Sequence, residues 1–387
     1  MSFFGDLQFF ICLIILLIPA IFLGVMEKSL KGYRLLSSLI FIFLVIGSDK
    51  KQLLFWGIFF LIEFLTVSIY LKLRKKYGRN NNIYTLFLVI SIIPLVLCKL
   101  FGILPFHLFQ ILGISYVTFR TAQIIIEIFD GVINEINFLE FTGFLIFFPS
   151  ISSGPIDRSR RFSEDWNKVY KRNEYLNLLG DGIEKILIGI LYKFVLAAIF
   201  YKIEESFIES YSFLSMLFYG YSYGFYMFFD FAGYSLMAIG TSYILGIKTP
   251  ENFNKPFISK DIKEFWDRWH ITLSHWFRDF VFSRFVMKCI KKKWFSTKLQ
   301  RASVGFIVNM LIMGVWHGIT PYYILYGLYH GILLAVTETY QKKSKFYKKN
   351  KKKKWYQVLS WFITINLVMF GFLIFSGRFT EYISKLL

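Results

Sequence analysis

Long apolar segments separated by short basic segments dominate the pattern of this chain. A helix that crosses the hydrocarbon core of a membrane perpendicularly needs about 20 mostly apolar residues. Eleven stretches approach or reach that length: residues 7–25, 32–46, 53–71, 83–97, 108–129, 186–200, 213–229, 232–245, 302–319, 322–337 and 358–375. Several are shorter than about 20 residues, so we expect about ten or eleven spans, some of them tilted or broken. Buried helices of a soluble protein could account for one such run but not for all of them. The pattern therefore predicts an all-α, polytopic integral membrane protein.

The basic segments predict how the spans are oriented. Residues 27–34, which follow the first apolar stretch, are basic, whereas the residues before that stretch carry Asp6 and no lysine or arginine. Because cytoplasmic loops carry an excess of lysine and arginine, this bias places the N-terminus outside the cell and the C-terminal segment 377–387 outside as well. The same rule makes four further segments cytoplasmic: residues 72–79, 158–172, 288–293 and 342–354. No small-residue cleavage site follows the first stretch, so we interpret it as a retained span and not as a signal peptide.

Composition and charge fit this class. The chain is 56% apolar, whereas soluble domains are about 45–50% apolar. A net charge of +20 could indicate nucleic-acid binding, but the lysines cluster beside spans, where topology and anionic lipid account for them, so no nucleic-acid partner is expected. The nine lysines of residues 342–354 indicate a solvated cytoplasmic loop, or a surface for an acidic protein partner. The three cysteines lie far apart, which predicts neither a disulfide nor a metal site.

No internal repeat or second soluble domain is visible, so we predict one membrane domain over residues 1–387. Within it we expect N-terminal spans over 1–130, a catalytic core over 131–341, a basic cytoplasmic loop over 342–356, and a last span with a tail over 357–387. Two stretches, 144–156 and 256–286, break the simple spanning pattern. Irregular backbone at membrane depth is tolerated only where it is buried in protein or lines a cavity.

His317 is the strongest candidate for chemistry. It lies near the end of the apolar stretch 302–319, where Asn309 is the only other strongly hydrogen-bonding side chain. Ionisable groups within membrane spans are costly and mark functional sites, and imidazole titrates near neutral pH, which suits proton transfer. The alternative is a structural histidine that reaches the interface or bonds to a neighbouring carbonyl.

The stretch 256–280 holds the densest set of polar and aromatic residues. We expect a helix there with Ser259 as its N-cap. One face of that helix carries five residues at i, i+3 and i+4 steps: Lys263, Trp266, His270, Ser274 and Arg278. Two interpretations remain open: an amphipathic helix lying on the headgroups, or a helix folded into the protein that lines a polar passage.

Four motifs in this order resemble the membrane-bound O-acyltransferase superfamily: residues 251–257 (ENFNKPF), 265–270 (FWDRWH), 276–280 (WFRDF) and 314–318 (GVWHG). Residues 113–120, 150–162 and 229–235 are similar to its branch of D-alanyl transfer proteins from Gram-positive bacteria. The alginate-type branch usually has a glycine-rich loop where this chain has residues 283–289. The resemblance covers essentially the whole chain and implies a helical bundle around a central conduit.

The resemblance also implies a reaction. The donor would be D-alanine held as a thioester on the phosphopantetheine arm of a small acidic carrier protein at the cytoplasmic face, and the eventual acceptor would be teichoic acid outside. The chain itself would bind no cofactor. His317 matches the principal histidine of the family and would be the base, and His270 matches the second histidine. Helical spacing, and not the resemblance, adds three expected substrate contacts: Trp266 and Ser274 on the polar face, and Asn309, which lies two helical turns from His317 and could orient it.

Partners follow from the same resemblance. A basic and apolar segment would dock the carrier protein, through Phe285, Val286, Met287, Lys291, Lys292 and Lys293. The alternative for residues 288–293 is a cytoplasmic loop whose lysines only reflect membrane topology. An extracellular D-alanylation partner and a small single-span peptide are also implied. Two alternatives remain: an O-acetyltransferase acting on another cell-envelope polysaccharide, and a transporter without acyl chemistry. Many transporters are built from repeats, and neither histidine region has a second copy. The sequence leaves open whether the acyl group passes directly to teichoic acid or through a partner.

Overall fold

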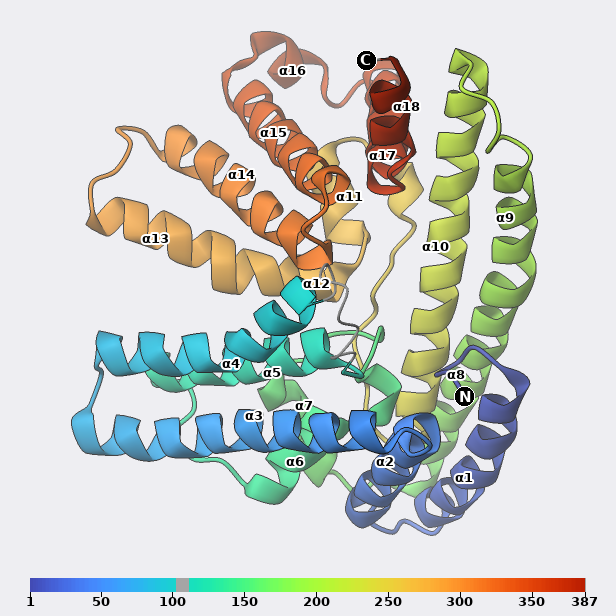
Figure 1. Ribbon diagram of the computed structural model, residues 1–387, viewed down its shortest axis with the longest axis vertical. Coiled ribbons are helices and arrows are strands. Elements are labelled where there is room, and N and C mark those ends of the chain that lie inside the picture. The colour runs from blue at the N-terminus through green and yellow to red at the C-terminus, as the bar shows by residue number, and fades with distance from the viewer. Residues whose placement is uncertain (102–110, 387) are drawn as a thin grey trace. The chain divides into compact units, whose positions relative to one another are not determined.

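The computed structural model describes residues 1–101 and 111–386 (Figure 1). Those residues form helices joined by loops, without a β-strand, so the predicted all-α class is confirmed. The predicted span over 108–129 begins partly outside the described residues, and its remainder is helix α5. By packing, the chain divides into two compact units, residues 1–190 with 233–251 and residues 191–232 with 252–387. The prediction of a single domain stays a prediction.

The helices are, in chain order, α1 (Leu7–Val25), α2 (Lys31–Ile46), α3 (Lys50–Tyr77), α4 (Asn81–Phe101), α5 (Ile114–Asp130), α6 (Phe138–Ile146), the 3₁₀ turn η1 (Phe148–Ser150), α7 (Ser159–Asn167), α8 (Arg172–Ile190), the π turn η2 (Leu191–Leu196), α9 (Ala197–Glu205), α10 (Phe213–Ile244), the 3₁₀ turn η3 (Pro256–Ile258), α11 (Ile262–Arg268), α12 (Ile271–Phe277), the π turn η4 (Arg278–Phe282), α13 (Ser283–Lys291), α14 (Lys298–His317), α15 (Pro321–Lys343), α16 (Lys345–Asn350), α17 (Lys354–Phe375) and α18 (Arg378–Leu386).

Six helices among the described residues are long and apolar enough to cross a membrane: α1, α3, α4, the continuous stretch Arg172–Glu205, α14 and α17. The larger number of spans expected from the sequence is therefore not confirmed. One part of that expectation is wrong, because the stretches 213–229 and 232–245 form the single helix α10. The polar residue that separates them, Asp230, does not interrupt the helix, since its carboxylate pairs with Lys193 of η2.

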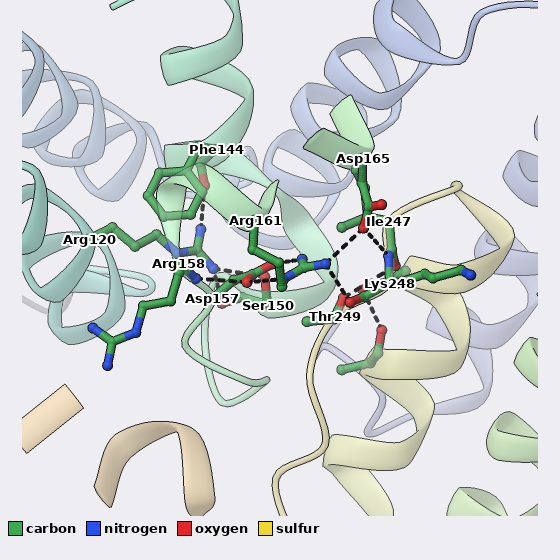
Figure 2. Close-up of polar contacts among 12 residues, drawn as sticks. Arg120, Phe144, Ser150, Asp157, Arg158, Arg161, Asp165, Ile247, Lys248 and Thr249 are labelled. Atoms are coloured by element: carbon green, nitrogen blue, oxygen red, sulfur yellow. Dashed lines mark hydrogen bonds and ion pairs between the residues drawn. The ribbon is translucent and has the colours of Figure 1, made fainter. Parts of the chain in front are cut away.

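In the first unit, α5 packs against α3 and α4, and nearly all of its residues are buried. The irregular segment 144–156 lies beside it and is held by Arg120 of α5. This guanidinium is 1% exposed and donates to the carbonyl oxygens of Phe144 at 2.7 Å and Leu145 at 3.0 Å, and to the hydroxyl of Ser150 at 2.7 Å (Figure 2). Of the two alternatives for this backbone, buried in protein or lining a cavity, the structure shows the first, and a side chain on a regular helix satisfies its carbonyl groups.

A second arginine holds the segment that follows, residues 157–165, within the same unit. Arg161 of α7 pairs with Asp157 and with Asp165, and it donates to the backbone oxygen of Lys248 (Figure 2). Asp157 is 2% exposed, and burial raises the pKa of this carboxyl although Arg161 opposes the shift. Removal of one partner would leave a buried charge unpaired, which costs about 3–5 kcal/mol.

In the second unit, α14 and α15 form the most extensive helix pair, and Figure 1 shows them side by side. Small residues bring their backbones together. A β-carbon on Gly314 would lie 2.4 Å from the carbonyl oxygen of Tyr323, and one on Gly327 would lie 2.4 Å from that of Met310. Close approach through small residues is a usual way to pack helices in membranes, where burial of apolar surface supplies little driving force. This pairing fixes the position of His317, the last residue of α14.

Candidate functional site

The stretch that was expected to form one helix from about residue 260 is broken at His270. Asp261, and not Ser259, caps α11, because its carboxylate accepts from the backbone N–H groups of Lys263 and Glu264. The predicted Ser259 cap is therefore wrong. His270 has φ +43°, which is the left-handed region that non-glycine residues rarely adopt. Strained backbone of this kind persists only where the surroundings hold it, and it occurs often at functional sites.

Asn252 holds the break in place. Its backbone oxygen accepts from the N–H of Ile271 at 2.9 Å. Its side-chain oxygen Oδ1 accepts from the N–H of Thr272 at 3.3 Å, accepts from the Thr272 hydroxyl at 2.8 Å, and lies 2.9 Å from Nδ1 of His270. Asn252 is 0% exposed. The segment around residue 252 therefore replaces the helical hydrogen bonds that the chain loses at His270.

These contacts decide which nitrogen of His270 carries the proton. A backbone N–H can only donate, so the Asn252 atom that faces Thr272 is the amide oxygen. That same oxygen faces Nδ1 of His270, so Nδ1 must carry a hydrogen and donate it. In the neutral ring Nε2 then holds a lone pair and is an acceptor. The imidazole of His270 has no other hydrogen bond within the described part of the chain, although its backbone oxygen accepts from the N–H of Ser274 at 2.9 Å.

The surroundings keep His270 neutral. The residue is 4% exposed, and its ring lies edge-to-face against Phe231 with centroids 4.7 Å apart. Burial, together with a smaller effect of charge on His317, lowers the pKa of His270 to about 3. That second effect places the two imidazoles within electrostatic reach of each other.

His317 occupies a different environment from His270. It is half-buried at the end of α14, and the chain turns at Gly318, where a β-carbon would lie 2.5 Å from the Tyr323 ring. Three rings of α15 and α17 surround the imidazole, with centroid distances of 5.0 Å to Phe375, 5.9 Å to Tyr323 and 6.3 Å to Tyr326. The aromatic wall limits the directions from which another group can reach this histidine.

The three expected substrate contacts lie on one pocket. Trp266, Ser274 and Asn309 line a cavity of about 310 Å³ in the second unit, together with Lys263 and Arg278. The face predicted from helical spacing is thus kept across the break, except that His270 does not line the cavity. Two polar atoms of this wall have no hydrogen-bond partner, Nε1 of Trp266 and Oδ1 of Asn309. The residues that line the cavity therefore include one buried unpaired donor and one buried unpaired acceptor.

A third histidine lies behind this wall and was not singled out from the sequence. His330 of α15 is 0% exposed, and neither of its ring nitrogens has a hydrogen-bond partner. Its ring contacts Trp266 at 5.2 Å and Tyr326 at 4.6 Å between centroids. Since Tyr326 also contacts His317, one aromatic layer connects His317 with the wall of the cavity.

The segment expected to dock a carrier protein is helix α13 and the turn after it. Met287 is 51% exposed and the next apolar position, Ile290, is 55% exposed. Lys291, Lys292 and Lys293 are exposed as well, whereas Phe285 and Val286 are half-buried. Val286 packs against α14, since its methyl group lies 3.2 Å from where Gly305 would carry a β-carbon. The exposed apolar patch is therefore centred on Met287 and Ile290.

No group of three or more histidine, cysteine or acidic side chains in the described parts of the chain could hold a metal ion. Helices apolar enough to span a membrane, with ionisable side chains in their packed core, define a multi-pass membrane protein. A family model described as "MBOAT, membrane-bound O-acyltransferase family" matches residues 130–384, so the chain belongs to the membrane-bound O-acyltransferase family.

Relatives with assigned functions match over almost the whole chain. The chain is 43% identical to a teichoic acid D-alanyltransferase of Bacillus subtilis, over 97% of this chain and 98% of the relative. It is 42% identical to a teichoic acid D-alanyltransferase of Streptococcus thermophilus, over 97% and 94% respectively. Similarity extends to a probable alginate O-acetylase of Pseudomonas syringae, 30% identical over 72% of this chain and 51% of the relative.

Proposed function

We propose that this chain transfers D-alanine from a thioester on the phosphopantetheine arm of a small acidic carrier protein to a hydroxyl on the route to teichoic acid. The names of its near full-length relatives support the acyl group and the acceptor. The observation that carries the proposal is the pair of histidines in one unit. His270 is neutral with Nε2 free to accept, and His317 lies close enough for its charge to lower the pKa of His270.

The reaction needs a base and no covalent nucleophile from the protein. His317 takes the proton of the acceptor hydroxyl, and the oxygen attacks the carbonyl carbon of the thioester. The tetrahedral intermediate then collapses, the C–O ester bond stays, the C–S bond breaks, and the proton passes from His317 to the departing thiolate. A positioned base contributes about 10²–10⁴-fold to such a step.

His270 orients a reacting partner and does not titrate. With its proton on Nδ1, its Nε2 accepts a hydrogen bond from an N–H or O–H donor of the arm or the acceptor. The unpartnered atoms of the cavity suit a pantetheine arm, which carries two amide groups. Nε1 of Trp266 donates to an amide carbonyl, and Oδ1 of Asn309 accepts from an amide N–H. Pairing these buried atoms removes a penalty of about 1–3 kcal/mol for each one.

The proposal includes the orientation and the partners. The carrier docks on the cytoplasmic face, where the lysines of residues 291–293 attract its acidic surface and Met287 and Ile290 supply apolar contact. The N-terminus lies outside the cell. An extracellular D-alanylation protein, with a small single-span peptide, takes the acyl group onward. The chain itself holds no cofactor.

The test is single-turnover transfer from purified D-alanyl carrier thioester. His317→Ala and His317→Gln should both reduce transfer by about 10²-fold or more, while thermal unfolding and carrier binding stay as in the parent. Transfer at the parental rate by a well-folded His317→Ala protein would refute the assignment of the base. The alternative function is that of an O-acetyltransferase, and the 30% identity to a probable alginate O-acetylase supports it. Transfer from an acetyl carrier thioester tests this alternative.

A further inference from the structure

A second cavity in the same unit takes no part in the proposed transfer. It measures about 360 Å³ and lies among α15, α16, α17 and the loop that leads into α11. Its wall includes neither His270 nor His317. It sits beside the most basic segment of the chain, residues 342–354, which is predicted to be cytoplasmic.

The cavity has an apolar side and a cationic side. Along α17, Leu359 is 46% exposed and Ile363 is 49% exposed, one turn apart, and Leu367 continues the same row. The other side carries two exposed lysines, Lys260 and Lys351. An exposed apolar row that ends in charge matches a molecule with a hydrocarbon chain and a charged head.

The ammonium groups of the two lysines form no ion pair with the described residues that line the cavity. Two acidic residues line it, but both are engaged. Asp261 accepts from the first N–H groups of α11 and from Gln341 at 3.0 Å, and Glu264 accepts from Arg268 at 2.8 Å. Glu264 also accepts from the backbone N–H of Lys260 at 2.8 Å, but neither lysine ammonium pairs with a carboxylate among the described residues. The ammonium of Lys260 donates to the amide oxygen of Gln357 at 3.0 Å.

Lys351 completes this charge pattern. Its ammonium lies over the ring of Tyr347, 5.7 Å from the centroid, and pairs with no acidic side chain among the described residues. Near it, the hydroxyls of Tyr340 and Tyr356 lie 3.3 Å apart at the cavity wall. Ammonium and hydroxyl groups together are donors that suit phosphate oxygens.

We propose that this cavity binds one anionic glycerophospholipid, with its phosphate between Lys260 and Lys351 and an acyl chain along Leu359, Ile363 and Leu367. The apolar row favours a lipid over a soluble phosphate. Two ammonium groups without an ion-pair partner in the part of the chain that the structure describes favour an anionic lipid over a zwitterionic one, because the anionic head brings no cation of its own beside them. The bound lipid would join α15 to α17 beside the basic segment 342–354, which includes α16.

Native mass spectrometry of the full chain in detergent tests the proposal with phosphatidylglycerol and phosphatidylcholine of identical acyl chains. At about 1 kcal/mol for each lysine near a membrane surface, Lys260→Gln with Lys351→Gln should weaken phosphatidylglycerol binding by about 30-fold. The matched control, Lys349→Gln with Lys352→Gln, removes equal charge from exposed lysines outside the cavity. It should bind phosphatidylglycerol as the parent does.

Two further arms separate the lipid from its alternatives. Ile363→Trp fills the apolar side and should displace the lipid with both lysines in place. Glycerol phosphate, which has the head without the chains, should not compete at concentrations that saturate the lipid. Equal binding of both lipids by the parent would overturn the proposal. So would an equal loss in the control pair, because diffuse attraction to the basic loop would then explain the binding.

Discussion

Asn252→Ala tests how the site controls His270. In the folded protein the Asn252 side-chain oxygen is the acceptor for the Nδ1–H of His270 and for two donors of Thr272. Alanine removes that oxygen and leaves the backbone bond to Ile271 in place. The hydrogen of His270 is then free to occupy Nε2, which converts the free acceptor of the ring into a donor.

The size of the effect follows from these bonds. A buried donor left without a partner costs about 1–3 kcal/mol, and three donors lose one shared acceptor, so we expect a loss of stability of about 2–5 kcal/mol after partial relaxation. The effect on transfer is separate. Loss of one hydrogen bond of about 1–3 kcal/mol between Nε2 and the substrate predicts a decrease of about 5–150-fold in kcat/KM.

The assay is transfer from D-alanyl carrier thioester at a temperature where the variant is folded, with thermal unfolding measured in parallel. Thr272→Val is the matched control. It removes the hydroxyl that donates to Asn252 at 2.8 Å and leaves the contact with His270 intact. It should lose stability and keep its kcat/KM. If Asn252→Ala also keeps its kcat/KM, or if Thr272→Val loses as much transfer as Asn252→Ala, the tautomer argument is wrong.

Three further outcomes are expected. Ser274→Cys, in a chain that lacks Cys12, Cys98 and Cys289, should react with water-soluble thiol reagents, because Ser274 lines the cavity. Loaded carrier should slow this reaction. A labelling rate that is the same with and without carrier would favour the interfacial interpretation. Met287→Asp should raise the dissociation rate of the carrier. A triple change to alanine at Lys291, Lys292 and Lys293 should mainly slow association of the carrier and weaken the salt dependence of that rate. An unchanged dissociation rate for Met287→Asp would mean that the carrier binds elsewhere. Gly327→Val should lower the stability to thermal unfolding by several kcal/mol, since its β-carbon would lie 2.4 Å from the Met310 oxygen. The control Gly180→Ala, whose β-carbon has nothing within 4 Å, should unfold at the same temperature as the parent.

The sequence alone was sufficient to predict the class of protein and several of the residues that line the cavity. Hydropathy reports whether a segment can lie in lipid, so the all-α membrane class followed directly from it. Helical spacing placed Trp266 and Ser274 on one face, and both line the cavity. The number of spans did not follow, because a single polar residue such as Asp230 ends an apolar run in the sequence without ending the helix.

The break at His270 could not be read from spacing. Nothing local in residues 262–277 forbids a continuous helix, since no proline or glycine interrupts it. The break depends on Asn252, which is 18 positions away in the sequence and supplies the hydrogen bonds that a helix would otherwise provide. Only one signal in the sequence pointed to that residue, its place in the motif at 251–257. The segment predicted to dock the carrier shows the same limit, because packing against Gly305 half-buries Val286 and leaves Met287 exposed.

An amide at position 252 also explains how the two histidines divide their roles. In the proposed mechanism His317 gains a proton during transfer and becomes cationic, and a second cation on His270 would oppose that step. Burial holds the pKa of His270 at about 3, and the neutral oxygen of Asn252 fixes Nδ1–H without attracting a charge. Because His270 titrates at about 6.5 when unfolded, the folded state binds fewer protons between about pH 6.5 and 3. Its contribution to stability is therefore present above about pH 6.5 and is lost as the pH falls towards 3.

Asn252→Asp tests whether a neutral His270 is needed for transfer. A carboxylate at that position keeps the acceptor for Nδ1–H and for Thr272, so the geometry and the tautomer of His270 should survive. The added negative charge would stabilise the imidazolium and raise the pKa of His270 towards neutral pH. The rate of transfer should then fall on the acid side at a higher pH than in the parent and approach the parental rate at alkaline pH, whereas Asn252→Ala should stay slow throughout. If Asn252→Asp follows the pH profile of the parent, charge on His270 does not affect the base, and the two histidines act independently.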